Sequence, residues 1–173
     1  MIEIDVSRLK NVPGSEENLV KEFEMQPVQT ELEEIFFKTP VRLDITLANK
    51  GDSIALSGMV EGSLRLACSR CLEYFEMPFS EEFNEVYYNV SKQDTRTNEV
   101  SDDWISFRGD TIDLTPEVIK TITSSLPMKL LCREDCRGLC QSCGKNLNVE
   151  TCDCPNDNTV IRLEKLRQLL EKE

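Results

Sequence analysis

The stretch CREDCRGLCQSCGKNLNVETCDC, residues 132–154, decides the fold of this chain because it concentrates the cysteines. Six of the eight cysteines lie in it: Cys132, Cys136, Cys140, Cys143, Cys152 and Cys154. The other two, Cys68 and Cys71, form a C-x-x-C pair far upstream, and the chain contains no histidine. A metal site in this protein would therefore be built from thiolates, with at most a carboxylate beside them.

The N-terminal sequence predicts a compartment in which these thiols stay reduced. MIEIDVSRLKNV has no basic segment followed by an apolar one, so we expect no signal peptide. No apolar run approaches the roughly 18–20 residues that span a bilayer, so we expect no membrane association. We therefore expect a cytoplasmic protein, where clustered cysteines favour a bound metal over disulfides.

The charge is strongly acidic and unevenly distributed. The net charge is −12 over 173 residues. Residues 128–173 carry eight Lys or Arg and eight Asp or Glu, so the whole excess lies in residues 1–127. Proteins that bind nucleic-acid backbones present a basic surface, which argues against tight nonspecific binding of nucleic acid. A basic protein partner fits this charge better.

The cysteine spacing predicts two four-cysteine sites, since Zn²⁺ prefers four tetrahedral ligands. The pairs are Cys68/Cys71, Cys132/Cys136, Cys140/Cys143 and Cys152/Cys154. Only eight residues separate Cys143 from Cys152, and Gly144 suits a turn that points backbone amides at sulfur. We predict one site from Cys140, Cys143, Cys152 and Cys154, and the other from Cys68, Cys71, Cys132 and Cys136. An alternative joins Cys68/Cys71 to Cys140/Cys143 and leaves Cys132, Cys136, Cys152 and Cys154 together.

Zinc in a structural role is the leading interpretation of both sites. Catalytic zinc keeps an open coordination position, commonly beside His or Glu ligands, and the lack of histidine argues against it. The alternatives are an iron–sulfur cluster and free or redox-active thiols. A redox C-x-x-C usually lies at a helix N-terminus near a βαβ unit, and neither C-x-x-C here has that setting.

Residues 41–79 carry the clearest strand pattern. Val41, Leu43, Ile45 and Leu47 alternate with polar residues, and a turn at 49–52 leads into a return strand. Gly58 and Gly62 in that strand predict a bend or bulge. Cys68 then falls at the strand end, and residues 74–79 begin the outgoing strand. We expect an α+β fold: a curved, mostly antiparallel sheet, open and barrel-like, with a few helices and a C-terminal Cys-rich zinc module.

Three helices are predicted around this sheet. Ser15 could cap a short helix over residues 15–25, with Leu19 and Phe23 on one face. Thr115 and Pro116 begin a second helix, capped by the Thr115 side chain. An amphipathic third helix covers 158–171. We accordingly predict a β-rich core domain over 1–127, a metal-binding module over 128–157 and a C-terminal helix over 158–173.

Several basic residues lie near the cysteines and have two interpretations. They are Arg65, Arg70, Lys129, Arg133 and Arg137. They could form a small basic patch for a partner. They could equally balance the thiolates, because a zinc ion with four cysteines carries a net charge of about −2.

The pattern as a whole resembles the bacterial YceD family, described as large ribosomal RNA subunit accumulation protein, with plastid relatives. The resemblance rests on CSRCL at 68–72, on a helix ending in Leu126-Pro127, and on LCREDCRGLCQSCGKNLN at 131–148. It implies a non-enzymatic role in accumulation or processing of large-subunit ribosomal RNA, through an assembly intermediate. It also implies that the eight cysteines are the metal ligands and that Arg70, Arg133 and Arg137 are the first positions to test for RNA or partner contact.

The sequence keeps two other functions open. One is a zinc-stabilised protein-interaction adaptor unrelated to ribosomes, and the other is a thiol redox enzyme. The expected partner of the leading function is a large-subunit assembly intermediate, either its RNA or a basic ribosomal protein. We expect no small-molecule substrate and no catalytic residues.

Overall fold

The computed structural model describes residues 1–29, 34–90 and 103–154. The chain divides into two compact units. The sheet unit comprises residues 1–66 and 76–128, and the cysteine unit comprises 67–75 together with the chain from 129 onward, described here to residue 154. The predicted division at 127 and 157 stays a prediction, and the predicted helix over 158–171 lies outside the described residues. In the part of the chain described here, no helix has the length and apolar character needed to cross a membrane.

Strands dominate the described residues. The strands are β1 (Glu3–Asp5), β2 (Glu16–Phe23), β3 (Val28–Gln29), β4 (Glu34–Phe37), β5 (Val41–Asn49), β6 (Ser53–Ala67), β7 (Tyr74–Asn89), β8 (Ile105–Phe107) and β9 (Thr111–Asp113). A 3₁₀ turn, η1 (Leu9–Asn11), follows β1, and one α-helix, α1 (Thr115–Ser125), follows β9. The α+β class with cysteine clusters is therefore confirmed in its coarse form.

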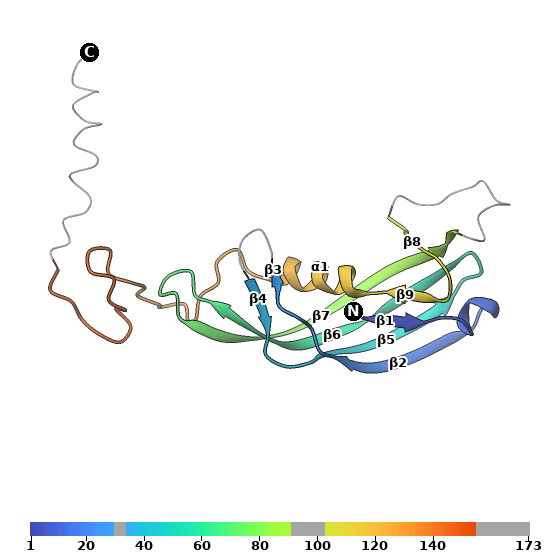
Figure 1. The fold of residues 1–173 in the computed structure, drawn as a ribbon, viewed down its shortest axis with the longest axis horizontal. Coiled ribbons are helices and arrows are strands. Elements are labelled where there is room, and N and C mark those ends of the chain that lie inside the picture. The colour runs from blue at the N-terminus through green and yellow to red at the C-terminus, as the bar shows by residue number, and fades with distance from the viewer. Residues whose placement is uncertain (30–33, 91–102, 155–173) are drawn as a thin grey trace, which may run out of the picture. The chain divides into compact units, whose positions relative to one another are not determined.

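The main sheet has the strand order β2-β5-β6-β4-β3, with β7 beside β6 and β8 beside β7 (Figure 1). The pairs β2–β5, β5–β6, β4–β6 and β3–β4 are antiparallel, whereas β7–β8 is parallel. A separate antiparallel pair joins β1 to β9. These pairings confirm the predicted, mostly antiparallel sheet. Among the described strands no pairing closes the sheet, so its barrel-like curl stays a prediction.

Residues 16–23 form a strand, so the predicted helix over 15–25 is wrong. β2 pairs with β5 along its whole length, from Glu16 opposite Ala48 to Phe23 opposite Val41. Leu19 and Phe23 are four residues apart, a spacing that fits one face of a helix and also one face of a strand. The Ser15 hydroxyl donates to the Val12 carbonyl at 2.6 Å and caps no helix.

The core lies on one face of the sheet, where the predicted alternation is confirmed. Val41, Leu43, Ile45 and Leu47 of β5 are all at most 1 % exposed. The buried residues of β6 and β7 also alternate along their strands. They are Ile54, Leu56, Val60, Leu64 and Leu66 on β6, and Phe79, Phe83 and Tyr87 on β7.

Helix α1 begins where predicted but is capped differently. Thr115 is its first residue and Pro116 lies in its first turn, while Leu114 holds the cap position without a side-chain hydrogen bond. The Thr115 hydroxyl instead accepts a 2.8 Å hydrogen bond from the Ile2 N–H and donates to Asp113. Helix α1 buries Val118 and Ile122, as its apolar spacing predicts.

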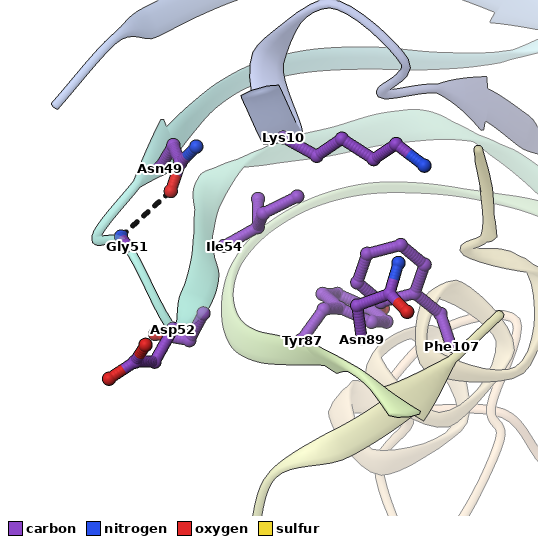
Figure 2. A pocket seen from close by; sticks show the side chains of 9 residues that line it. Lys10, Asn49, Gly51, Asp52, Ile54, Tyr87, Asn89 and Phe107 are labelled. Atoms are coloured by element: carbon purple, nitrogen blue, oxygen red, sulfur yellow. Dashed lines mark hydrogen bonds between the residues drawn. The ribbon is translucent and has the colours of Figure 1, made fainter. Parts of the chain in front are cut away.

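The predicted turn at 49–52 joins β5 to β6. The Asn49 side chain accepts a 2.7 Å hydrogen bond from the Gly51 N–H (Figure 2), and Gly51 has a φ of +98°, which glycine adopts without strain. The turn borders a shallow hollow that Tyr87 and Phe107 also line. Asn49 donates to the Leu9 carbonyl, so its polar groups are bonded within the protein.

Gly58 and Gly62 allow close approach of neighbouring atoms, and Gly58 makes no bulge in β6. The register of β5 against β6 runs without a break from Arg42–Glu61 to Asn49–Ile54 and passes through Gly58 opposite Ile45. A Cβ atom on Gly58 would lie 2.3 Å from the Asp44 carbonyl oxygen, and one on Gly62 would lie 2.8 Å from the Phe79 ring. The predicted bulge at Gly58 is therefore wrong, because the missing side chain makes room for the neighbouring strand.

This close approach gives the first prediction. In an ordinary strand an alanine is more stable than a glycine, but Gly58→Ala must displace backbone atoms of β5 and should lower the free energy of unfolding by about 1–3 kcal/mol. Urea unfolding measures the change. Ser57→Ala, at an exposed neighbouring position, is the matched control and should stay within about 0.5 kcal/mol of the wild type. An unchanged or raised stability of Gly58→Ala would show that the strands do not need this contact.

Candidate metal centre

Cys68 and Cys71 lie in the tight turn between β6 and β7. The Leu72 N–H donates to the Cys68 carbonyl at 2.9 Å, and the Cys68 N–H donates to the Glu73 carbonyl at 2.9 Å. Leu72 closes this turn with a φ of +61°, an unusual conformation for a leucine. The turn places both sulfurs on one side, as the C-x-x-C spacing predicts.

Within the described residues 129–154, the chain packs against this turn through its backbone. The Ser69 N–H donates to the Leu130 carbonyl at 2.7 Å, and the Leu139 N–H donates to the Arg70 carbonyl at 3.1 Å. Gly138 has a φ of +73°, and a Cβ there would lie 2.9 Å from the Arg70 carbonyl oxygen. Cys132 and Cys136 are thereby brought to Cys68 and Cys71.

These four cysteines form the first cluster. The Sγ atoms of Cys68 and Cys136 are 3.8 Å apart, and so are those of Cys71 and Cys132. All four sulfurs lie within 4.8 Å of one another. Phe75, Leu131 and Leu139 pack around them, and three of the four cysteines are at most 3 % exposed.

The second cluster consists of Cys140, Cys143, Cys152 and Cys154, whose sulfurs also lie within 4.8 Å of one another. Its first pair is shaped by a turn in which the Gly144 N–H donates to the Cys140 carbonyl at 2.9 Å, and Gly144 has a φ of +73°. The Cys140 N–H donates to the Lys145 carbonyl at 2.8 Å. This cluster is more exposed than the first. The structure thus groups the eight cysteines as the spacing predicts, and the alternative grouping is wrong.

The sulfur positions fit a tetrahedral metal ion. A zinc–sulfur bond is about 2.3 Å, so the edge of a tetrahedral ZnS₄ unit is about 3.8 Å. In the first cluster the Cys68–Cys136 and Cys71–Cys132 separations, both 3.8 Å, match that edge. A disulfide would bring two sulfurs to about 2.05 Å, and all eight cysteines are free thiols. Each cluster could therefore hold one metal ion.

Hydrogen bonds and burial act in opposite directions on the first cluster. Burial raises the pKa of Cys68, but backbone hydrogen bonds from Cys132, Cys71 and Arg70 outweigh it and lower the pKa to about 6. Burial, followed by the neighbouring sulfurs of Cys136 and Cys71, raises the pKa of Cys132 to about 12. The Cys68 thiol is therefore the more acidic and the Cys132 thiol the less acidic of the two, and a cation bound among the sulfurs would favour ionisation of both.

In the second cluster, too, the pKa of one thiol is lowered and that of another is raised. Backbone hydrogen bonds from Cys143 and Ser142 lower the pKa of Cys140 to about 6. The sulfur of Cys143, followed by burial, raises the pKa of Cys154 to about 12. Amides directed at a sulfur are the feature expected of a turn that presents thiolates to a metal ion.

The three arginines singled out from the sequence have different surroundings. The Arg70 guanidinium donates to the carbonyls of Cys136 at 2.9 Å and Glu134 at 3.3 Å, so it holds the segment around Cys136. Arg133 donates to the Asn148 amide oxygen at 2.8 Å and lies 3.4 Å from Asp135. Arg137 is exposed, and within the described chain its guanidinium makes no hydrogen bond or ion pair. Their contact with RNA or a partner stays a prediction.

Asn148 is a residue that the sequence reasoning missed. Its side chain donates to the Cys136 sulfur at 3.3 Å and accepts from the Arg137 N–H at 2.8 Å. It comes from the loop between Cys143 and Cys152, so it reaches from the second cluster to the first. An asparagine in a short loop between cysteines could have suggested this role, because its amide can donate to a thiolate.

An α+β protein with two four-thiol clusters is the class that this geometry defines. A sequence model of the YceD family, described as "Large ribosomal RNA subunit accumulation protein YceD", matches residues 56–170. The match covers more than half of the chain, and the chain belongs to the YceD family.

Individual relatives agree with this assignment. An uncharacterized protein of Mycobacterium leprae is 28 % identical over 150 residues, which cover 84 % of this chain and 67 % of that protein. The uncharacterized protein YlbN of Bacillus subtilis is 27 % identical over 137 residues, 78 % of this chain and 77 % of that protein. The chloroplastic "Large ribosomal RNA subunit accumulation protein YCED homolog 1" of Arabidopsis thaliana is 24 % identical over 141 residues. These cover 67 % of this chain but only 44 % of the plant protein. No solved structure matches the chain.

The contacts of Arg70 lead to the second prediction. Arg70→Ala removes the donor to two carbonyls of the cysteine unit. It should lower the free energy of local opening by about 1 kcal/mol, which makes local hydrogen exchange about fivefold faster. Hydrogen-exchange mass spectrometry of peptides covering 67–75 and 129–140 measures the effect. Arg137→Ala, whose side chain makes no such bond, is the control and should leave exchange unchanged. Equal effects of the two variants would contradict the role given to Arg70.

Proposed function

We propose that each cluster binds one Zn²⁺ and that all eight cysteines are ligands. Four sulfurs complete a tetrahedral shell and leave no position for a substrate, so the metal ions stabilise the cysteine unit and do not catalyse a reaction. The support is the tetrahedral fit of the sulfurs together with the absence of histidine from the sequence. The chemistry that zinc supplies here is charge neutralisation and cross-linking of chain segments.

We propose further that the protein promotes accumulation of large-subunit ribosomal RNA by binding an assembly intermediate in the cytoplasm. The observation that carries this proposal is membership of the YceD family, whose description names that process. The named plant relative supports it. The role is non-enzymatic on this proposal.

The charge distribution favours a basic ribosomal protein as the component that the sheet unit contacts. The net charge of −12 arises entirely in residues 1–127. On β2, Glu16, Glu17 and Glu22 are exposed, and Glu82 is exposed on β7. Such a surface attracts a basic partner and repels the phosphates of RNA.

Metal content is the third prediction. The protein purified from cells should contain two zinc ions per chain, and its thiols should react with a thiol reagent only after a chelator removes the metal. Cys136→Ser should lower the content to about one zinc, since one cluster loses a ligand while the other keeps four. Elemental analysis measures both. An iron–sulfur absorption spectrum, or fast thiol reaction without a chelator, would contradict the zinc assignment.

Association with ribosomal particles is the fourth prediction. The protein should co-sediment with precursor large subunits, and the variant Glu16→Lys/Glu17→Lys should reduce that association at least several-fold, because it reverses the charge of an exposed strand. Asn18→Ala on the same strand is the neutral control. Absence of co-sedimentation would favour the adaptor function. Loss caused by Arg137→Glu, with no effect of the β2 variant, would instead indicate contact with RNA.

A further inference from the structure

The Asn148 side chain uses all of its hydrogen-bonding capacity at the junction of the two clusters. Its amide nitrogen donates to the Cys136 sulfur at 3.3 Å and to the Asn146 side-chain oxygen at 2.9 Å. Its amide oxygen accepts from the Arg137 N–H and from the Arg133 guanidinium, both at 2.8 Å. Two donors and two acceptor positions are the full inventory of an asparagine side chain.

These contacts allow only one orientation of the amide. Turning it over would place its oxygen against the Asn146 oxygen and its NH₂ group against the donors of Arg133 and Arg137. The orientation in the structure therefore aims an N–H group at the Cys136 sulfur, which belongs to the first cluster. A hydrogen bond from an N–H group to a thiolate orients the sulfur lone pairs and tunes the sulfur as a metal ligand.

The loop that carries Asn148 is held by the second cluster. Residues 144–151 connect Cys143 to Cys152, so both ends of this eight-residue loop adjoin members of that cluster. Inside the loop, the N–H groups of Val149 and Glu150 donate to the Asn146 carbonyl at 3.1 and 3.0 Å. The Leu147 N–H donates to the Gly138 carbonyl at 2.9 Å. Joining the loop ends at a metal ion would remove much of the conformational freedom that Asn148 otherwise has.

We propose that Asn148 is a positioning residue for Cys136 and that it couples the two clusters, so that metal in the second cluster raises the metal affinity of the first. This inference rests on the two metal sites proposed above. The second cluster draws all its ligands from residues 140–154 and forms from local chain, whereas the first must join segments more than sixty residues apart. A metal ion held by the second cluster would restrain the loop so that Asn148 presents its donor to Cys136, and the coupling free energy is reciprocal.

The test is a four-variant cycle on the full chain, titrated with Cd²⁺ against a competing chelator and followed by ¹¹³Cd NMR. The backgrounds are the intact protein and Cys152→Ser/Cys154→Ser, each with Asn148 and with Asn148→Ala. The two cadmium signals are assigned with Cys71→Ser and Cys152→Ser. In the intact background Asn148→Ala should weaken metal binding at the first cluster by about 10–100-fold. In the background without the second cluster its effect should shrink to about threefold or less.

The spectra separate positioning from a general loss of structure. Asn148→Ala should shift the signal of the first cluster and leave the signal of the second in place. Asn148→Asp keeps the acceptor oxygen and the shape but cannot donate from the same atom, so it should also shift the first signal and weaken binding there. Val149→Ala changes an exposed neighbour in the same loop and should change neither signal nor affinity.

The results that would overturn the inference differ from those that would overturn the metal sites. Equal weakening by Asn148→Ala in both backgrounds would refute the coupling, and unchanged affinity in both would refute the positioning role. Fewer than two cadmium ions bound by the wild type would instead refute the proposed sites themselves.

Discussion

The proximity of four sulfurs is the constraint on which the cysteine unit depends. Thiolates within 4.8 Å of one another repel, and in each cluster the pKa of one thiol is raised while the pKa of another is lowered, so a cation among the sulfurs would favour their ionisation. Several features of the surrounding backbone bring the sulfurs to this distance. They are two tight turns, glycines with positive φ at 138 and 144, and amides directed at sulfur.

The same constraint explains why the cysteine grouping could be predicted from spacing. The paired cysteines are two to four positions apart and are joined by turns, and eight residues link Cys143 to Cys152, so local geometry leaves few ways to assemble four sulfurs. The buried strands were predictable for a similar reason. Val41 to Leu47 alternate without interruption, and an alternation of that length has only one structural meaning.

Other features depend on contacts that no local pattern records. Leu19 and Phe23 fit either a helix or a strand, and pairing with β5 decides between them. In the sequence Gly58 suggests a bend or bulge, but glycine is needed there because the β5 backbone lies too close for a side chain. Arg70 and Asn148 are ordinary polar residues until the chain brings them to Cys136. The sequence therefore predicted the proposed ligands and missed the Asn148 contact that orients one of them.

Few apolar side chains lie at the centre of the cysteine unit in the residues that the structure describes. Among the described residues 129–154 there is no helix or strand, only an isolated bridge between Leu139 and Asn146. Its buried centre is formed by Cys68, Cys71 and Cys136, with a few half-buried side chains against them. The sulfurs are themselves the core, so a cation that binds them would stabilise the whole unit. On the proposed function, a partner would then be bound by the exposed residues around the clusters, because four-sulfur coordination leaves the metal no free position.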